Sequence, residues 1–493
     1  MKQIVYRLSC LIVWMAFVVL PVYALDPPKT QDEQRAWEQK FDKLNVRHTR
    51  AMIKDTSNQF LAVPADYTGP RDFTLAKTPP LIEFAVIQDL EPEYLPYDLA
   101  RKTGGAWGGW GDMTRGPDGC FYFSISSHLS YNGDAYVIKY DPVKKTHRRV
   151  VSIRDIIGWT PDEFGDGKIH GDMDFGPDGT TWFLSYFAPF PTRREWNNVY
   201  RGSYVFRYNA LTGKTEQFGI PLEGDSWPYF NYDWKRGVLF SVGQMGHVLV
   251  YDTKGKRLIF GGCPPDSISW YERCTMLDSE TGVFYTTDSP SPLYEINGVK
   301  PRVVSEYRFV SYTRRNNEFV RMKAVVPKNP VTGKSGPCRS HTEEKDKDGA
   351  FWCFDFQGTL FKFFPAQDRT EMVGVNWDKS GSYTANMCMS PGGRYLYYIP
   401  GLAFGIPKGT PVVQYDTRTG TKKVLAFIWN FYFDKYGYSP VRCYGVELDK
   451  KGESLVFYAN GGFTGQEDKT PYEVRMRRPA VYQLHIPAGE RVE

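Results

Sequence analysis

The sequence predicts an all-β fold, a seven-bladed β-propeller with a short helical N-terminal arm. The main observation is a phrase that recurs seven times: an apolar strand, a tight turn, an aromatic strand, and a third strand ending in an aromatic residue followed by Asp, Asn or Pro. Gly and Asp in the turns accept the backbone conformation that a tight reversal needs, so each turn indicates a hairpin. The seven turns are residues 116–119, 176–179, 235–237, 279–282, 346–349, 391–393 and 449–452.

Length and composition agree with this fold. Seven blades of about 40 to 50 residues would use most of a 493-residue chain in one all-β unit. Aromatic residues make up 16% of the chain, as expected where every sheet buries both faces between its neighbours. No stretch after residue 24 is apolar for long enough to span a bilayer.

The remaining strands of each blade follow the turns in order. Second strands are expected at residues 120–126, 180–186, 238–243, 283–288, 350–356, 395–400 and 454–460. Third strands are expected at residues 136–141, 204–209, 247–252, 293–297, 359–364, 412–416 and 480–486. Fourth strands are weakly marked, for example at residues 148–153 and 423–428, as expected for solvated outer strands.

The N-terminal region predicts export. Lys2 and Arg7 precede an apolar run, and a small-residue cleavage site ends at Ala24, so residues 1–24 are typical of a signal peptide. We expect a secreted or periplasmic protein with no stable membrane insertion after cleavage. Removing the two charges lowers the formal net charge from +5 to +3.

Residues 25–79 form an arm without the repeat, followed by the propeller at residues 80–493. Residues 31–58 carry apolar side chains at helical spacing and predict a helix on the propeller rim, with an extended segment at residues 59–79. Residues 81–87 predict an outer strand that closes the ring against the last blade. The arm could also serve as a contact surface for a protein partner.

Seven cysteines follow the signal segment, an odd number that excludes complete pairing within the chain. Cys120, Cys353 and Cys388 lie in apolar strands and are expected to be buried thiols. Cys263 and Cys274 could bridge one loop. The chain lacks a Cys-x-x-Cys pair, which argues against thiolate zinc sites and c-type haem.

Loop lengths differ between the two ends of the predicted propeller. The seven turns lie at one end, here called the turn face. Five insertions are assigned to the other end, the insertion face: residues 154–167, 186–203, 309–336, 399–411 and 460–479. Binding residues concentrate on long loops of rigid scaffolds.

The insertions contain 15 Lys and Arg against 9 Asp and Glu, a charge of +6. They could form a basic rim suited to an anionic ligand. Its members would be Arg193, Arg194, Arg201, Arg314, Arg315, Arg321, Lys323, Arg475, Arg477 and Arg478. Alternatively, these charges belong to solvated loops that never converge.

Polar residues also gather at the expected channel mouth on the insertion face. His170 and His341 hold nearly equivalent places, nine and eight residues before the Gly that closes the turn. His128 and His247 are assigned to the same face. Other blades place similar groups there: Trp110, Asp112, Asp172, Tyr229, Asn231, Tyr232, Glu272, Arg273, Arg339, Asn386, Arg442 and Tyr444. Each alone could simply cap a strand or bind channel water, but together they favour a site.

The first functional hypothesis is a lyase that acts on an anionic, uronate-containing polysaccharide or oligosaccharide by β-elimination. Such a reaction needs a neutralised carboxylate, a base and an acid. His170, His341 and Tyr232 are the catalytic candidates, because His titrates near neutrality and Tyr beside Arg can be drawn toward phenolate. The substrate-binding candidates are Trp110, His128, Asn231, Arg273, Arg339, Asn386 and Arg442.

Residues 174–183, Asp-Phe-Gly-Pro-Asp-Gly-Thr-Thr-Trp-Phe, resemble the blade motif of streptogramin lyases and of gluconolactonase-type propellers. The resemblance covers this blade well and residues 116–123 in part, and it implies the hairpin of a propeller blade. The His and Arg residues at the mouth are also similar in arrangement to those of propeller polysaccharide lyases. No catalytic residue follows from these resemblances.

Two alternatives remain open. A lactonase or hydrolase could hold Ca²⁺ with oxygens of Asp172, Asn231, Glu272 and Asn386. The basic rim argues against a cation there, and the lyase hypothesis needs no cofactor. The other alternative is a non-enzymatic propeller, a subunit or glycan-binding module. We expect no nucleic-acid partner.

Overall fold

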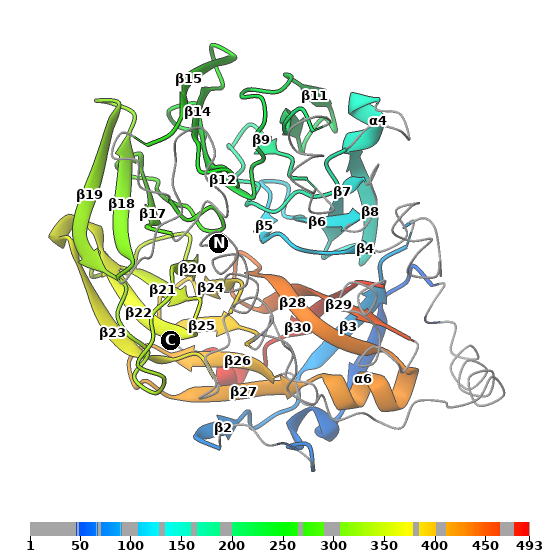
Figure 1. Cartoon of the computed structure of the whole chain (residues 1–493). Coiled ribbons are helices and arrows are strands. Elements are labelled where there is room, and N and C mark those ends of the chain that lie inside the picture. The colour runs from blue at the N-terminus through cyan, green and yellow to red at the C-terminus, as the bar shows by residue number, and fades with distance from the viewer. Residues whose placement is uncertain are drawn as a thin grey trace, which may run out of the picture.

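The computed structural model is a seven-bladed β-propeller built from seven sheets. It describes residues 46, 49–65, 67, 71–88, 90, 107–127, 134–158, 165–187, 200–264, 270–289, 306–377, 384–400, 411–463 and 478–492. Figure 1 shows the sheets arranged radially, with the inner strands β5, β12, β20, β24 and β28 nearest the centre. The predicted seven-bladed β-propeller is therefore confirmed.

The strands run outward from the centre in chain order within each blade. Blade 1 holds β4 (Trp107–Gly108), β5 (Met113–Arg115), β6 (Phe121–Ser127), β7 (Ala135–Asp141) and β8 (Thr146–Ser152). Blade 2 holds β9 (Thr180–Leu184), β10 (Val205–Asn209) and β11 (Thr215–Gln217). Blade 3 holds β12 (Tyr229–Asp233), β13 (Val238–Val242), β14 (Val248–Asp252) and β15 (Arg257–Gly262).

Blades 4 to 7 repeat the pattern. Blade 4 holds β16 (Met276–Asp278), β17 (Val283–Thr287), β18 (Arg308–Thr313) and β19 (Glu318–Val325). Blade 5 holds β20 (Cys338–His341), β21 (Phe351–Asp355), β22 (Thr359–Phe364) and β23 (Arg369–Val375). Blade 6 holds β24 (Met387–Met389), β25 (Tyr395–Tyr398), β26 (Pro411–Asp416) and β27 (Lys422–Phe427), and blade 7 holds β28 (Ser439–Leu448), β29 (Ser454–Gly462) and β30 (Ala480–His485).

The seven predicted turns are present in all seven blades. Their closing glycines share a left-handed backbone, with φ between 68° and 81°, which residues with a Cβ adopt only under strain. In the first turn the Gly119 amide donates to the Gly116 carbonyl at 3.0 Å, and Asp118 Oδ1 accepts from the Cys120 amide. Glycine at this place therefore fixes the register of each inner hairpin.

Aromatic side chains fill the spaces between blades. Phe240 of blade 3 stacks on Phe284 of blade 4, with ring centroids 4.7 Å apart. Phe309 and Phe363 stack at 3.8 Å between blades 4 and 5. Because every sheet is covered on both sides in this way, the high aromatic content is a requirement of the ring.

The ring closes with a strand from the N-terminal part of the chain, as predicted. β3 (Leu81–Val86) pairs antiparallel with β30, and β1 (Ile53–Thr56) pairs with β3 at the outer edge of blade 7. β2 (Phe73–Leu75) adds a parallel strand to β27 of blade 6. The segment before residue 80 thus covers the edges of two blades.

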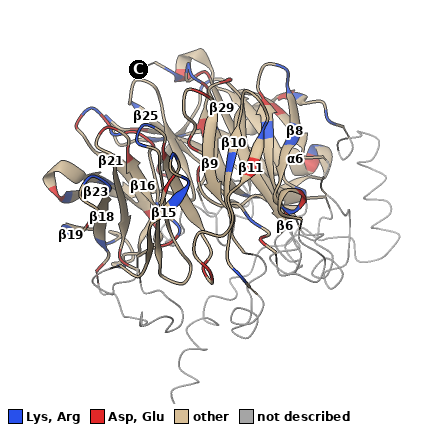
Figure 2. Ribbon diagram, turned by 90° about the horizontal axis from the view of Figure 1, so that it is seen from above, with Lys and Arg blue, Asp and Glu red and all other residues tan. Residues whose placement is uncertain are grey.

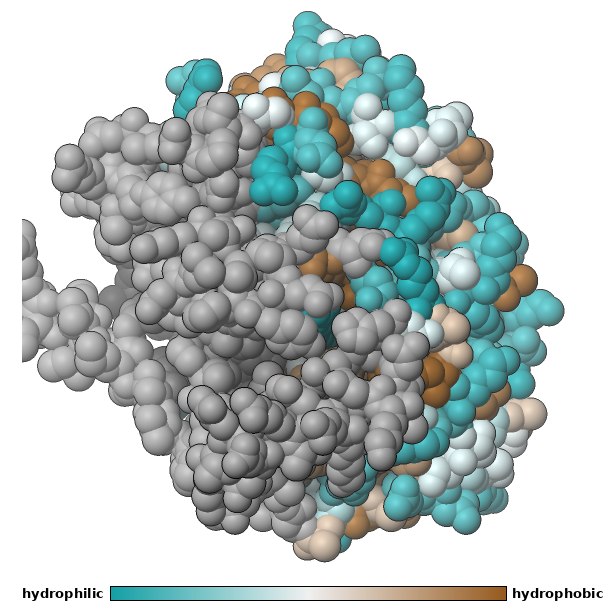
Figure 3. Space-filling model, turned by 90° about the vertical axis from the view of Figure 1, so that its right-hand side faces the viewer, coloured by the Kyte–Doolittle hydropathy of each residue, from teal (hydrophilic) through white to brown (hydrophobic). Residues whose placement is uncertain are grey.

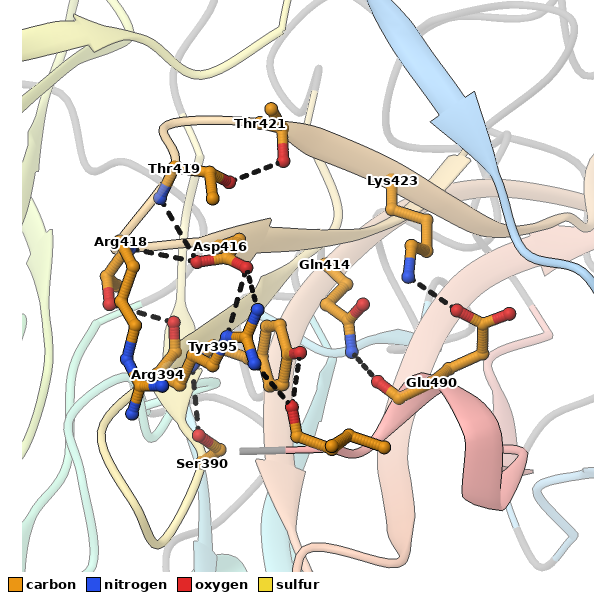
Figure 4. A network of polar contacts seen from close by, with 12 residues as sticks. Ser390, Arg394, Tyr395, Gln414, Asp416, Arg418, Thr419, Thr421, Lys423 and Glu490 are labelled. Atoms are coloured by element: carbon orange, nitrogen blue, oxygen red, sulfur yellow. Dashed lines mark hydrogen bonds and ion pairs between the residues drawn. The ribbon is translucent and has the colours of Figure 1, made fainter.

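A second closure comes from the C-terminal tail, whose 3₁₀ turn η4 (Ala488–Glu490) lies against blade 6 (Figure 4). Gln414 donates to the Glu490 carbonyl at 2.7 Å, and Lys423 forms an ion pair with the Glu490 carboxylate. Tyr395 and Arg394 both donate to the Val492 carbonyl at 2.7 Å. The chain therefore continues past its last strand to bind the preceding blade.

The predicted helix at residues 31–58 is wrong in its described C-terminal part, where Ile53–Thr56 is strand β1. Its earlier part lies outside the described residues, as do residues 1–24. The 3₁₀ turn η1 (Asn58–Leu61) packs Phe60 against Phe431, with ring centroids 4.4 Å apart. Phe431 belongs to helix α6 (Trp429–Tyr436), which the sequence analysis did not predict and which leads from blade 6 to blade 7.

Two further elements complete the described chain, helix α4 (Ile153–Ile157) after β8 and the 3₁₀ turn η2 (Pro365–Gln367) between β22 and β23. Neither α-helix of the described residues has the length and apolarity needed to cross a membrane. On the described surface visible in Figure 3, hydrophilic residues predominate and apolar residues form small separate groups.

Blade 4 differs from the prediction. The third strand was expected at residues 293–297, which lie outside the described residues, but the strand paired with β17 is β18 (Arg308–Thr313). The segment 309–336, predicted to be an insertion, instead contains most of β18 and all of β19. Residues 293–297, Leu-Tyr-Glu-Ile-Asn, match the repeat and were therefore predicted to be the third strand. The hairpin of β18 and β19 is longer and more polar, and was predicted to be a loop.

Candidate functional site

The inner strands decide which side chains face the central channel. Successive side chains of a strand point to opposite sides. On β12, Tyr229 and Asn231 bond to the inner strands of neighbouring blades, whereas Phe230 and Tyr232 belong to the apolar cluster between blades 2 and 3. Residues two apart on an inner strand therefore lie on the same side of the sheet.

His170 lies on the inner segment of blade 2, at the end that leads to the insertion face. This segment is held by a bridge between Lys168 and Tyr186, with amide-to-carbonyl hydrogen bonds of 3.0 and 2.8 Å in both directions. The His170 side chain is only 6% exposed. Its Nδ1 atom is buried and has no hydrogen-bond partner among the described residues.

Three cationic side chains lie near enough to His170 to act on its charge. Lys168 Nζ lies 5.3 Å from the ring centroid of Trp110 and 5.1 Å from that of Tyr186, so the ammonium group sits among aromatic rings. Arg273, from blade 4, is partly exposed. Arg339, on β20, is buried and donates to the carbonyls of Arg273 and Ala385 at 3.4 and 3.3 Å.

Burial and these cations together set the protonation of His170. Burial lowers the pKa of its imidazole well below the ordinary value, and the positive charges of Arg339, Arg273 and Lys168 lower it further. At neutral pH the ring is therefore uncharged and one of its nitrogens can accept a proton.

Glu272 brings a carboxylate to the same place. Its Oε1 atom lies 3.5 Å from Arg273 Nε, whereas Oε2 is buried without a hydrogen-bond partner among the described residues. Burial raises the pKa of Glu272, Arg273 opposes this rise, and the nearby Asp225 charge adds to it. Gln244 joins Glu272 to Tyr186, whose hydroxyl donates to Gln244 Oε1 at 2.8 Å.

We call the group formed by Lys168, His170, Tyr186, Glu272, Arg273 and Arg339 the His170 site. It draws on blades 2, 4 and 5 and carries three positive charges. Two of its buried atoms, His170 Nδ1 and Glu272 Oε2, have no hydrogen-bond partner among the described residues. An anion that also carries a hydrogen-bond donor has the chemistry to fit such a group.

A second polar network joins the inner segments of blades 1, 2 and 3. Tyr229 donates to Asp112, and its hydroxyl oxygen lies 3.2 Å from Asp172 Oδ2. Thr114 donates to Asp172 Oδ1 at 3.0 Å. Burial raises the pKa of Asp112 to about 6, even though Arg339, Tyr229 and Asn386 all favour its ionised form.

Four of the sequence-predicted residues lie in or beside the His170 site: Trp110, His170, Arg273 and Arg339. His341 is buried elsewhere, between blades 4 and 5, with Nε2 at 3.0 Å from the Thr275 carbonyl and Nδ1 at 3.0 Å from its neighbour's carbonyl. Both ring nitrogens thus face backbone oxygens. Tyr232 packs in the apolar cluster between blades 2 and 3.

The other predicted residues are distributed along the channel. Asn231 accepts a hydrogen bond from Thr275 at 2.7 Å, and Asn386 accepts one from the Val446 amide at 3.0 Å. Arg442 is buried on β28 of blade 7. His128 lies outside the described residues.

Sequence reasoning missed Lys168, Tyr186 and Gln244. Lys168 stands two residues before His170, and that spacing on an extended strand places both on one side. Tyr186 is its bridge partner on the neighbouring strand. The two-residue period of a strand could therefore have predicted Lys168. Gln244 comes from the next blade, and no sequence pattern pointed to it.

The basic rim is wrong in part. Arg314 and Arg315 lie between β18 and β19 and therefore on the turn face, and Arg321 of β19 binds Asp288 at 2.6 Å. Most of the remaining rim residues lie outside the described residues. Figure 2 shows Lys and Arg interspersed with Asp and Glu over the described outer strands.

The oxygens considered for Ca²⁺ do not converge. Asn231, Asn386 and Asp172 accept hydrogen bonds from Thr275, Val446 and Thr114 respectively. Glu272 lies beside Arg273 instead. Within the described ranges, no group of three or more His, Cys, Asp or Glu residues is arranged to hold a metal ion.

None of the seven cysteines after the signal segment forms a disulfide bond with another described residue. Cys274 and Cys338, each adjacent in sequence to a site arginine, have sulfur atoms 3.9 Å apart. Cys263, the other half of the expected bridge, is not bonded to Cys274. Cys120, Cys353 and Cys388 are buried, as predicted.

Comparisons with protein-family models and with curated proteins found no match. The likeness to streptogramin lyases therefore remains a likeness of blade motifs. The fold is established by the seven sheets, and the function has to be argued from the His170 site.

Proposed function

We propose that this chain is a secreted or periplasmic enzyme that cleaves an anionic, uronate-containing glycan by β-elimination. The observation that carries the proposal is the open Nδ1 of His170, a buried and uncharged imidazole beside Arg339, Arg273 and Lys168. A base next to a group of fixed cations is the combination that removal of a proton beside a carboxylate requires.

The three cations would hold the uronate carboxylate and stabilise the negative charge that develops on it. Nδ1 of His170 would take the proton from the carbon next to that carboxylate. The C–H electron pair then forms the carbon–carbon double bond, and the bond from the neighbouring carbon to the glycosidic oxygen breaks. Cleavage therefore needs no water and no oxidant.

The departing oxygen must receive a proton. His170 can return the one it has taken, because the same cations that lower its pKa make the imidazolium a strong acid. Proton removal and return would then occur on one side of the sugar. His341 and Tyr232 are not needed in this scheme, and their positions do not favour it.

The test is a panel of uronate polymers, pectic, ulvan-like, alginate and glycosaminoglycan, with the ultraviolet absorbance of unsaturated products as the readout. We expect activity on at least one polymer, retained in EDTA and reduced at least about 100-fold in His170→Asn. A matched control is His485→Asn, at the end of β30 in blade 7, with its folding checked because His485 pairs with Glu83.

Absence of cleavage across the panel would contradict the proposal. Binding of a polymer without cleavage would instead support the alternative, a non-enzymatic glycan-binding propeller. Cleavage abolished by EDTA and restored by Ca²⁺ would favour a metal-dependent enzyme.

A further inference from the structure

Glu272 stands out in the His170 site because it is an acid among cations. It is 5% exposed, and its Oε1 atom is near Arg273. Its Oε2 atom is buried and has no hydrogen-bond partner among the described residues. Burying a carboxylate oxygen without a donor is costly, so a ligand that supplies one would gain affinity here.

Arg273 interacts with both His170 and Glu272. Its charge acts on His170 and it lies beside Glu272. A ligand carboxylate held by Arg273 would therefore place its neighbouring atoms near both residues. In a uronate those neighbouring atoms carry hydroxyl groups.

We propose that Glu272 determines substrate class by accepting a hydrogen bond from a free sugar hydroxyl of the bound uronate. This inference rests on the proposed function. It restricts the substrate to uronans that are not sulfated on that sugar. A sulfate ester would remove the hydroxyl donor and bring a second negative charge close to a buried carboxylate.

The inference opposes the simplest expectation from charge. Three cations alone would favour the most highly charged polymer, so a sulfated uronan would bind best. Glu272 reverses that order locally, since a hydroxyl offers Oε2 a hydrogen-bond donor and a sulfate ester offers none. The site then attracts one negative charge and discriminates against a second.

The experiment compares matched substrates. Polygalacturonate, glucuronan and alginate are each tested beside their own chemically sulfated derivatives, for binding by calorimetry and for cleavage by absorbance. We expect the wild-type protein to favour the unsulfated polymer by about tenfold or more in kcat/KM. Glu272→Gln should reduce that preference about tenfold, because the amide carries no charge.

Glu280→Gln is the control, since Glu280 is 71% exposed in a turn of the same blade. It should keep the wild-type preference. Equal or better cleavage of the sulfated partner by the wild-type protein would overturn the inference and leave the proposed function standing. Neither binding nor cleavage of any polymer would overturn both. If Glu272→Gln fails to fold, the comparison of sulfated and unsulfated polymers with the wild-type protein still tests the inference.

Discussion

The hydroxyl oxygen of Tyr229 in blade 3 lies 3.2 Å from Oδ2 of Asp172 in blade 2, and the same hydroxyl donates to Asp112 in blade 1. A phenol has one hydrogen, which Asp112 receives. With the Tyr229 hydrogen on Asp112, the contact with Asp172 is a hydrogen bond when Asp172 carries a proton. Burial and the Asp112 charge raise the pKa of Asp172 well above its ordinary value, in agreement with this arrangement.

The first prediction concerns stability against pH. Because the pKa of Asp172 is raised on folding, its contribution is complete below about pH 4 and is lost as pH rises through the folded value. Asp172→Asn keeps an acceptor for Thr114 and a donor for Tyr229 without titrating. Its unfolding free energy should match the wild-type value near pH 4 and exceed it by about 1 kcal/mol or more at pH 8, measured by urea unfolding.

Asp252→Asn, at the end of β14 where the side chain is 25% exposed, serves as the control for that comparison. It should lack the pH-dependent gain. A loss of stability in Asp172→Asn that is equal at all pH values would contradict the protonated state of Asp172.

The second prediction concerns activity against pH. In the proposed reaction neutral His170 acts as the base, and its pKa is lowered by burial and then by Arg339, Arg273 and Lys168. The acid limb of kcat/KM should therefore lie below the pH at which an ordinary histidine titrates. Arg273→Gln removes a positive charge, so it should shift the limb upward and reduce kcat/KM by about 10- to 100-fold.

Arg257→Gln, whose side chain is 75% exposed on blade 3, should leave the pH profile unchanged. An acid limb that does not move in Arg273→Gln would separate the arginine from His170 and contradict the site.

The third prediction separates two tyrosines. Tyr232→Phe should keep kcat within about twofold of wild type, because its ring packs between blades. Tyr229→Phe removes the hydroxyl that joins Asp112 and Asp172, and should lower the unfolding free energy by about 1–3 kcal/mol. Loss of activity in Tyr232→Phe with unchanged stability would return Tyr232 to the catalytic role first assigned to it.

The fourth prediction concerns ring closure. Glu83 of β3 is buried and binds Lys54 at 3.3 Å, Lys145, and His485 Nε2 at 2.8 Å. Lys145 and His485 lower the pKa of Glu83 against the effect of its burial. Its contribution is therefore present above the ordinary carboxyl pKa and is lost as pH falls through the folded value.

Glu83→Gln should lower the unfolding free energy at pH 7 by about 1–3 kcal/mol, with a difference that shrinks in acid. The control is Glu371→Gln, which breaks an exposed pair with Arg369 and should change stability by less than about 1 kcal/mol. Similar small losses in both variants would show that Glu83 does not hold the ring closed.

The seven turns could be predicted because a tight turn requires a left-handed backbone conformation that Gly and Asp favour. This requirement is local and does not depend on contacts with distant residues. The third strand of blade 4 could not, since strand pairing depends on partners far along the chain and residues 293–297 match the repeat as well as β18 does. Tyr232 was chosen over Tyr229 because composition does not reveal which alternate residues of a strand face the channel. His170 could be assigned to the inner segment of blade 2 because the turn that follows it, at residues 176–179, was predicted at the right place.

The account is tested most directly by the masses of the oligosaccharides released from an active uronan. β-Elimination predicts new ends that are lighter by one water than the products of hydrolysis, formed by the wild-type protein and lost in folded His170→Asn. The proposed mechanism would be contradicted by products with the full mass expected from hydrolysis. It would also be contradicted if His170→Asn formed elimination products at the wild-type rate.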